Sequence, residues 1–304
     1  MSINTVAPEA PSTKNAAVSP GRRIWRTAYA EPQFRVGLVL LMLLIGAALI
    51  YPHLTSLSVT KIAVADRFKP PVFLPDGTWL HPLGTDQLGR DMFLRSLVGL
   101  QNALLISVTA VVAMFAFGAV IGLFSGYYGG WIDTVLMRIT DAQLAVPVII
   151  LAITILTVQR PSVETVTLVL ALSGWPAYAR VIRSVTLSER RREYVRGAKI
   201  LGASDLRIIF QLIAPNVLPP IAFVAVLDIA RMMIFEAILG FIGIGVQPPT
   251  PTFGNIIADG QKYLINAWWV ATMPGAFLFV SLLGINLIGT SVEQARNKVL
   301  GGTI

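Results

Sequence analysis

Four of the ionisable residues inside the apolar stretches of this chain of 304 residues could contact a solute. They are Asp141, Asp228, Arg231 and Glu236. A charged side chain in the hydrocarbon layer of a membrane is costly and usually pairs or faces water. Each of the four is therefore a candidate for the wall of a solute path, where it would recognise a charged solute without making or breaking bonds.

Three of these residues also have a structural explanation. Asp141 can pair with Arg138 one helical turn earlier, which is the interpretation that we favour. Asp228 and Arg231 are three residues apart and can pair with each other, which lowers the cost of burying them. Glu236 has no opposite charge four residues away in either direction. It must face another helix, a neighbouring subunit or the path, and it is the strongest candidate for a lining residue.

Several kinds of chemistry are excluded by residue type. The chain has no cysteine and two histidines, His53 and His81, which are too far apart in sequence to suggest a metal cluster. GxxxxGK[ST], HExxH and GxSxG do not occur. We therefore expect no catalytic residue, no metal ligand and no ATP site in this chain. If ATP drives the protein, another subunit must bind it.

The composition indicates a membrane protein. Hydrophobic residues make up 55% of the chain and charged residues 13%, against about 25% charged residues in soluble proteins. We predict an all-α polytopic membrane protein. The net charge of +8 is better explained by the distribution of Lys and Arg around membrane spans than by nucleic-acid binding.

Six apolar stretches predict transmembrane helices, since about 20 apolar residues cross the hydrocarbon layer. They are Phe34–Leu54, Leu100–Phe124, Thr134–Thr157, Thr165–Ile182, Val217–Val246 and Val270–Val292. The expected organisation is a cytoplasmic tail (1–33), a first span (34–54), an outer segment (55–99), a five-helix domain (100–292) and a cytoplasmic C-terminal tail (293–304). Residues 1 to about 20 are expected to be disordered.

The basic residues predict the orientation. Of the 24 Lys and Arg residues, sixteen lie in segments that this topology places inside the cell and seven in outer segments. Basic residues favour the cytoplasmic side. Both termini and the loop 183–215 are therefore predicted to be cytoplasmic.

Inside that loop, Glu193–Leu201 predicts a short helix with Tyr194, Ala198 and Leu201 on one face. Gly202 follows as a natural stop, because glycine accepts the left-handed conformation at a helix C-terminus. A helix of this length is marginal alone in water, so something must receive its apolar face. It either packs on the protein's own body or enters a groove of a partner.

A second short helix is expected after the glycine. Ser204 is a candidate N-cap for Asp205–Ile213. Pro215 is expected to end that helix, before the chain becomes apolar again. The predicted unit is a helix, a glycine elbow, a helix and a proline stop.

Two further patterns have structural explanations. His81–Leu97 (HPLGTDQLGRDMFLRSL) predicts an amphipathic helix that begins near Asp86 or Asp91. Gly118, Gly122 and Gly126 recur every fourth residue. Such a stripe lets helix backbones approach closely.

The loop resembles the cytoplasmic EAA loop of binding-protein-dependent ABC importers, with Glu-Ala-Ala, three residues, Gly, nine residues and Ile-x-Leu-Pro. Ala198, Gly202 and Pro215 match this pattern, whereas Arg196 stands in place of the Glu and Gly197 in place of the first Ala. The motif between Gly84 and Arg90 and the stretch GVQPPTP also resemble one permease of the dipeptide, oligopeptide and nickel importers.

This resemblance implies a type I ABC importer permease fold in the bacterial inner membrane, with no enzymatic activity and no cofactor in this chain. The implied partners are a homologous permease, two ATPase subunits that carry ATP and Mg, a periplasmic or lipid-anchored solute-binding protein, and membrane lipid. The solute would most simply be a di- or oligopeptide. The residues implied in coupling to the ATPase are Glu193, Arg196, Gly197, Ala198, Lys199, Gly202, Ala203, Ser204 and Pro215.

The residues alone are also compatible with two other functions. An ion-coupled secondary transporter would need ion sites at broken helices near the midplane, usually in inverted repeats. No internal repeat is evident here. A membrane scaffold without transport is the second alternative.

Overall fold

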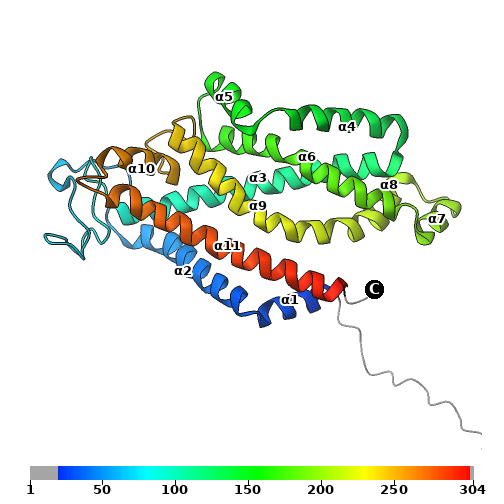
Figure 1. The fold of residues 1–304 in the computed structure, drawn as a ribbon, viewed down its shortest axis with the longest axis horizontal. Coiled ribbons are helices and arrows are strands. Elements are labelled where there is room, and N and C mark those ends of the chain that lie inside the picture. The colour runs from blue at the N-terminus through cyan, green and yellow to red at the C-terminus, as the bar shows by residue number, and fades with distance from the viewer. Residues whose placement is uncertain (1–19, 302–304) are drawn as a thin grey trace, which may run out of the picture.

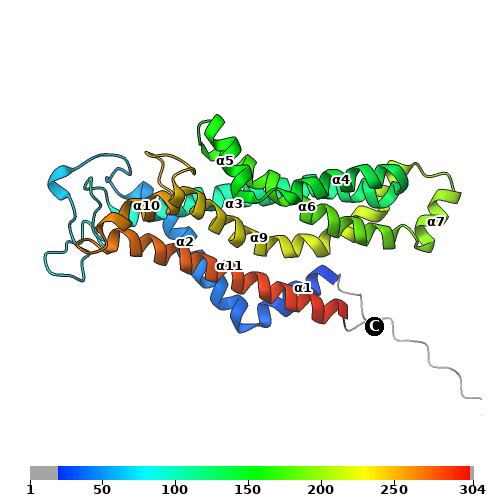
Figure 2. The ribbon, with the colours of Figure 1, turned by 45° about the horizontal axis from the view of Figure 1, so that its top comes forward.

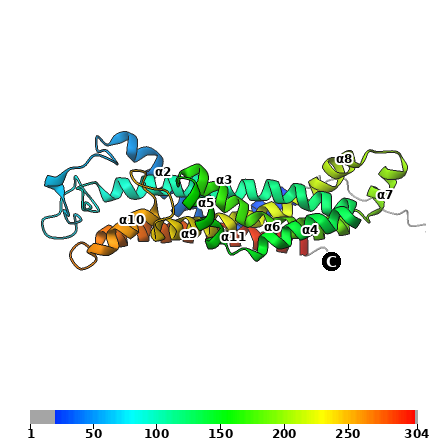
Figure 3. The same cartoon turned by 90° about the horizontal axis from the view of Figure 1, so that it is seen from above.

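The computed structural model describes residues 20–301, which form an elongated bundle of helices (Figure 1). The helices are α1 (Pro20–Ala30), α2 (Pro32–Leu54), η1 (Val64–Asp66), α3 (Met92–Tyr128), α4 (Gly130–Ala145), α5 (Val148–Val158), α6 (Val163–Glu189), α7 (Glu193–Ile200), α8 (Asp205–Arg207), η2 (Ile208–Ile213), α9 (Ala214–Ile242), α10 (Phe253–Gly260), η3 (Gln261–Tyr263) and α11 (Trp269–Gly301). The loop between α6 and α9 lies at one end of the bundle, and α10 with the segment 55–91 lies at the other (Figure 3).

Four helices in the described part are long and apolar enough to cross a membrane, namely α2, α3, α6 and α11. The pair α4 and α5 would add a fifth span if the two cross together. The remaining long helix, α9, has 29 residues and contains three of the four candidate residues, namely Asp228, Arg231 and Glu236. The helical membrane fold is confirmed, while the number of six spans stays a prediction.

The predicted third span is not one straight helix. Its two halves, α4 and α5, meet at an angle of 82° (Figure 2). Pro147 disfavours helical backbone in the residue before it, and Val146 is accordingly extended, with φ −89° and ψ 115°. The predicted stretch Thr134–Thr157 is therefore divided at Pro147, and its crossing of the membrane as one span stays a prediction.

The glycine stripe on α3 has the predicted packing role. A Cβ atom at Gly122 would lie 2.7 Å from the carbonyl oxygen of Ala179 and 2.8 Å from Cβ of Ile182. Gly118 and Gly126 meet α6 equally closely. The stripe thus brings the backbones of α3 and α6 together between Gly118 and Gly126.

Both ends of the chain contain more helix than predicted. Residues 20–30 form α1, and Ile24 and Ala28 pack against Val292 and Ala295 of α11. The predicted disordered tail lies mostly in residues 1–19, outside the described residues. The C-terminal segment that begins at residue 293 continues α11 as far as Gly301.

The fifth predicted span begins earlier than expected. The chain passes from α8 through a π-helical turn, η2, directly into α9, and Pro215 lies at the start of that helix. The helix ends at Gly243, whose φ of 91° is left-handed. The proline stop at Pro215 was therefore wrong. Pro215 stands where the π-helical turn passes into α9, and the helical run continues through it.

Candidate coupling loop and intramembrane charges

The loop between α6 and α9 is fastened to the end of α3. Arg190 follows α6 and donates from Nη1 to the carbonyl oxygens of Gly126 (3.1 Å) and Tyr127 (2.8 Å). The last carbonyls of a helix lack partners within the helix, so this guanidinium group caps α3. The hydroxyl of Tyr127 in turn donates to Oδ1 of Asp205 (2.6 Å), which ties α8 to the same point.

The elbow after α7 is a closed hydrogen-bonded turn. Gly202 has a φ of 82°, and its N–H donates to the carbonyl of Lys199 (3.1 Å), while the N–H of Ala203 donates to that of Ala198 (3.0 Å). This pair of bonds is the Schellman motif. The predicted role of Gly202 as the helix stop is confirmed, and the elbow is held by its own backbone.

The buried face of α7 differs from the predicted one. Val195 is buried, and Ala198 packs against the same core cluster. Leu201, predicted on the same face as Ala198, is 88% exposed, and its neighbour Ile200 is 86% exposed. Leu201 does not share the face of Ala198 because the helix ends at Ile200, so helical periodicity no longer applies at Leu201. Two large apolar side chains therefore stand in solvent at the tip of the elbow.

The second short helix is held by its buried isoleucines. Ser204 occupies the N-cap position of α8, but its side chain makes no capping hydrogen bond. Its carbonyl accepts from the N–H of Ile208 (3.0 Å). Ile208, Ile209 and Ile213 are fully buried in the core. The buried isoleucines of η2 therefore hold the second short helix in place, and a side-chain cap from Ser204 does not.

The loop residues predicted to take part in coupling differ in exposure. Among them, Glu193, Arg196, Lys199, Gly202, Ser204 and Pro215 are exposed, whereas Gly197, Ala198 and Ala203 are half-buried. The structure therefore presents part of this set on the surface of the loop and places the rest against the body of the protein.

Asp141 does not pair as expected. Its Oδ1 accepts from Nη2 of Arg180 on α6 at 2.6 Å, and both side chains are about half exposed. The expected partner Arg138 lies one turn away on the same helix. The prediction was wrong because it considered α4 alone, whereas α4 packs along α6.

Asp228 and Arg231 form the predicted pair on α9. Nη2 of Arg231 lies 3.0 Å from Oδ1 of Asp228. The hydroxyl of Tyr178 on α6 donates to Oδ2 of the same carboxylate, a partner that the sequence did not indicate. All three residues line a cavity of about 630 Å³ between α6, α9 and α11.

Glu236 is enclosed by this chain. Its side chain is fully buried, and neither carboxylate oxygen has a hydrogen-bond partner among the described residues. The element packed against α9 on this side is α10, which Thr252 precedes. Glu236 thus faces another helix, one of the three expected surroundings. A lining role stays a prediction.

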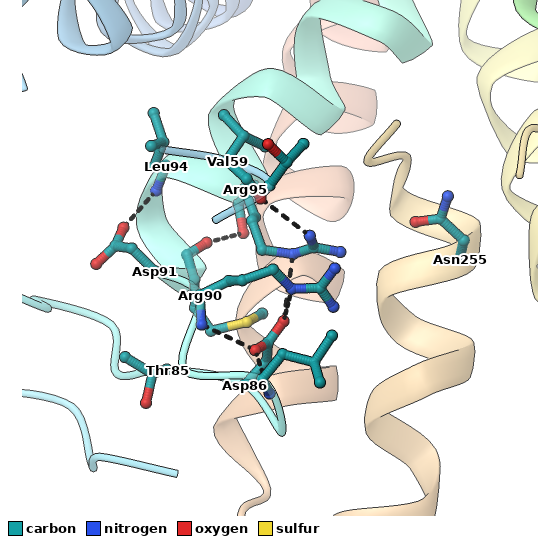
Figure 4. A network of polar contacts seen from close by, with 12 residues as sticks. Val59, Thr85, Asp86, Arg90, Asp91, Leu94, Arg95 and Asn255 are labelled. Carbon is teal, nitrogen blue, oxygen red and sulfur yellow. Dashed lines mark hydrogen bonds and ion pairs between the residues drawn. The ribbon is translucent and has the colours of Figure 1, made fainter. Parts of the chain in front are cut away.

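A buried ionic network lies at the end of the bundle opposite to the loop (Figure 4). Oδ1 of Asp86 accepts from the backbone N–H groups of Leu88 (2.8 Å) and Arg90 (2.9 Å). Its Oδ2 accepts from Nε of Arg90 (2.7 Å) and lies 3.6 Å from Nε of Arg95. We call these residues, with His81 and Asp91, the Asp86 network.

The same network fixes the start of α3. Asp91 caps the helix by accepting from the N–H of Leu94 (2.7 Å), which confirms one of the two predicted N-caps. Its other oxygen lies 2.9 Å from Nδ1 of His81. Desolvation by burial raises the pKa of the Asp91 carboxyl above its usual range.

The motif is also joined to α11. Nε1 of Trp269, at the start of α11, donates to the carbonyl of Thr85 (3.1 Å). The motif 84–90 therefore joins the segment 55–91 to α3 and α11.

The described residues form a bundle of membrane-spanning helices. The structure resembles that of the MetNI methionine ABC transporter in an inward-facing form, with a TM-score of 0.52 and 17% identity over 65% of this chain and 94% of that chain. At this identity the likeness concerns the fold.

Residues 118–298 match the family described as binding-protein-dependent transport system inner membrane component, and the chain belongs to that family. It is 35% identical over 285 residues to a dipeptide transport system permease protein DppC of Alkalihalophilus pseudofirmus, covering 94% of this chain and 92% of the relative. It is 32% identical over 265 residues to DppC of Haemophilus influenzae, covering 87% and 90%.

This membership decides between the functions that the residues left open. The chain is a permease component of an ABC importer, a multi-pass membrane protein with ATP hydrolysis on separate subunits. It is not an enzyme itself. The ion-coupled secondary transporter is not supported. Within residues 20–301, no group of three His, Asp or Glu side chains is placed to hold a metal ion.

Proposed function

We propose that this chain forms, with a homologous permease, the path of a bacterial inner-membrane importer for di- or oligopeptides. A solute-binding protein delivers the peptide, and two ATPase subunits supply ATP and Mg. The peptide is inferred from the relatives, which are named as dipeptide or di/tripeptide permeases. Both termini and the loop of α7 lie in the cytoplasm, as the basic residues predict.

The observation that carries the proposal is the exposed apolar tip of the loop. Ile200 and Leu201 are among the most exposed large apolar residues of the chain, and they stand beside a turn closed by two backbone bonds at Gly202. Aliphatic side chains on a rigid support are suited to a partner's pocket, because little conformational freedom is lost on binding. The ATPase is the partner that this loop would contact, and ATP-driven movement of the loop would reach α6 and α9, between which it lies.

We place the solute path along the face of α6 and α9 that carries Asp228 and Arg231. Asp228 and Arg231 are on it, and the Asp141–Arg180 pair lies on the neighbouring surface of α4 and α6. We keep Glu236 as a candidate whose carboxyl would have to become accessible in a second conformation. Alternating access then consists of the path opening to one side of the membrane at a time.

The proposal is tested by removing the apolar tip. Leu201→Ser and Ile200→Ser should each reduce recovery of the ATPase with the permease pair by about tenfold, the usual effect of losing a central apolar anchor. The measurement is co-purification from membranes, together with ATP-dependent uptake of a dipeptide into proteoliposomes.

Ile265→Ser is the matched control, because Ile265 is 97% exposed but lies between η3 and α11, at the other end of the bundle. It should leave ATPase recovery unchanged. Normal recovery and uptake in both loop variants would show that the tip makes no contact that matters for coupling.

A further inference from the structure

The cavity between α6, α9 and α11 is lined by charged residues as well as apolar ones. Arg231, Asp228 and Arg296 contribute charges, and Tyr178 and Val181 contribute part of the wall from α6. Arg296 donates from Nη1 to the carbonyl of Pro220 near the start of α9 (2.8 Å). The cavity therefore reaches from the loop-side end of α9 to the middle of that helix.

The charges in the cavity are unequally satisfied. Both oxygens of Asp228 are occupied, one by Arg231 and the other by the hydroxyl of Tyr178. Arg231 makes no other hydrogen bond or ion pair within residues 20–301, although a guanidinium group has five N–H donors. Its side chain is 51% exposed and that of Asp228 is 19% exposed. Asp228 thus orients the guanidinium group and leaves donors facing the cavity.

The cavity contains more arginine than acidic side chains, and this positive charge favours an anionic ligand. A half-exposed arginine on a helix within the membrane is stable only if it faces water or a polar ligand. One carboxylate and two guanidinium groups leave a net positive charge. Guanidinium groups bind carboxylates with two parallel hydrogen bonds. A free divalent cation would be repelled, and a neutral sugar would leave the excess charge unmatched.

The dimensions agree with a short peptide. Pro220 and Arg231 are separated along α9 by about 16 Å, at 1.5 Å for each residue of the helix. An extended peptide spans about 3.3–3.6 Å for each residue. A di- or tripeptide therefore fits in the cavity with its carboxylate at Arg231, since Arg296 already donates to Pro220 and Asn297.

We propose that the cavity between α6, α9 and α11 is a solute site in which Arg231, oriented by Asp228, binds the C-terminal carboxylate of the transported peptide. This assignment rests on the proposed import function. Arg231 is the recognition residue, Asp228 and Tyr178 are positioning residues, and Arg296 adds positive charge near the loop-side end.

The absence of cysteine from the chain allows a direct test. In the assembled transporter in lipid nanodiscs without nucleotide, Val181→Cys should react with a charged, membrane-impermeant thiol reagent. Millimolar dialanine should slow this reaction, and the same dipeptide with an amidated C-terminus should not. Adding Arg231→Gln should raise the dialanine concentration needed by about tenfold, the effect of losing a hydrogen bond to a charged group, while Arg231→Lys should restore part of the protection.

Val112→Cys is the matched control. Val112 is 62% exposed and Val181 is 50% exposed, but Val112 lies near the middle of α3 and is not among the residues that line the cavity. The proposal is overturned if the two cysteines react equally fast, if the amide protects as well as the acid, or if Arg231→Gln leaves protection unchanged. The comparison of acid and amide in the Val181→Cys protein decides the matter even if the Arg231 variants do not assemble.

Uptake separates this proposal from the proposed function. If proteoliposomes with the binding protein accumulate dialanine only with ATP, yet Val181→Cys is not protected, the import function stands and the cavity assignment is wrong. If no peptide is taken up with ATP, the import function is wrong and the cavity assignment falls with it.

Discussion

Asp86 accepts four polar contacts in a site with almost no exposure to solvent, and two arginines depend on it. A buried charge is tolerated when its partners satisfy it, and removal of one partner leaves the other charge uncompensated. The motif between Gly84 and Arg90 therefore has a structural explanation that the sequence did not supply. It holds the segment 55–91 against the start of α3.

Asp86→Asn should destabilise the protein by about 3 kcal/mol, because Arg90 and Arg95 lose their buried counter-charge. The thermal unfolding midpoint in detergent measures the effect. The control is Asp66→Asn, since Asp66 pairs with Lys69 at 2.5 Å on a partly exposed surface, and such pairs contribute at most about 1 kcal/mol. Equal midpoints in the two variants would contradict a stabilising network.

At this scale, one of the two ion pairs predicted within a helix is formed, and the other is replaced by a pair between helices. Asp228 and Arg231 pair as their spacing indicates, whereas Asp141 pairs with Arg180 on another helix and not with Arg138. Spacing along a helix determines which side chains share a face. It contains no information about which other helix will pack on that face.

At the scale of the elements, α3 and α6 share the most extensive contact between any two helices of the described part. Gly122→Ala should place a methyl group against the backbone of Ala179 and the side chain of Ile182. Overpacking of this kind costs about 1–3 kcal/mol. We expect a lower unfolding midpoint in detergent and less assembled transporter.

Gly46→Ala on α2 is the matched control, because a Cβ atom there meets nothing within 4 Å. Alanine also has the higher helix propensity. The midpoint of this variant should be unchanged or slightly raised. If Gly122→Ala were as stable as Gly46→Ala, the close approach of the two helices would not be needed.

The elements themselves were predicted where apolar runs and turn residues agree. The glycine stripe, the left-handed stop at Gly202 and the N-cap at Asp91 follow from local chemistry. Prolines were harder to interpret. Pro147 divides two helices, whereas the helical run passes through Pro215. The effect of a proline depends on whether the preceding residues can remain helical, as they do in the buried π-helical turn η2.

On the scale of the whole molecule, α3 connects the two regions discussed above. It has 37 residues, about 55 Å at 1.5 Å for each residue. Asp91 of the Asp86 network caps its first turn, and Arg190 of the loop caps its last carbonyls. A push on the loop would therefore act on a helix held at both ends.

The central claim is that the tip of the loop contacts an ATPase subunit. The chain has no cysteine, so Leu201→Cys and Ile265→Cys each carry a single reactive thiol. In membranes that contain the assembled transporter, a short bifunctional reagent should crosslink Leu201→Cys to the ATPase, and Ile265→Cys should give no such product. Crosslinking of Ile265→Cys to the ATPase, or of neither variant under conditions in which ATP still drives uptake, would contradict the account.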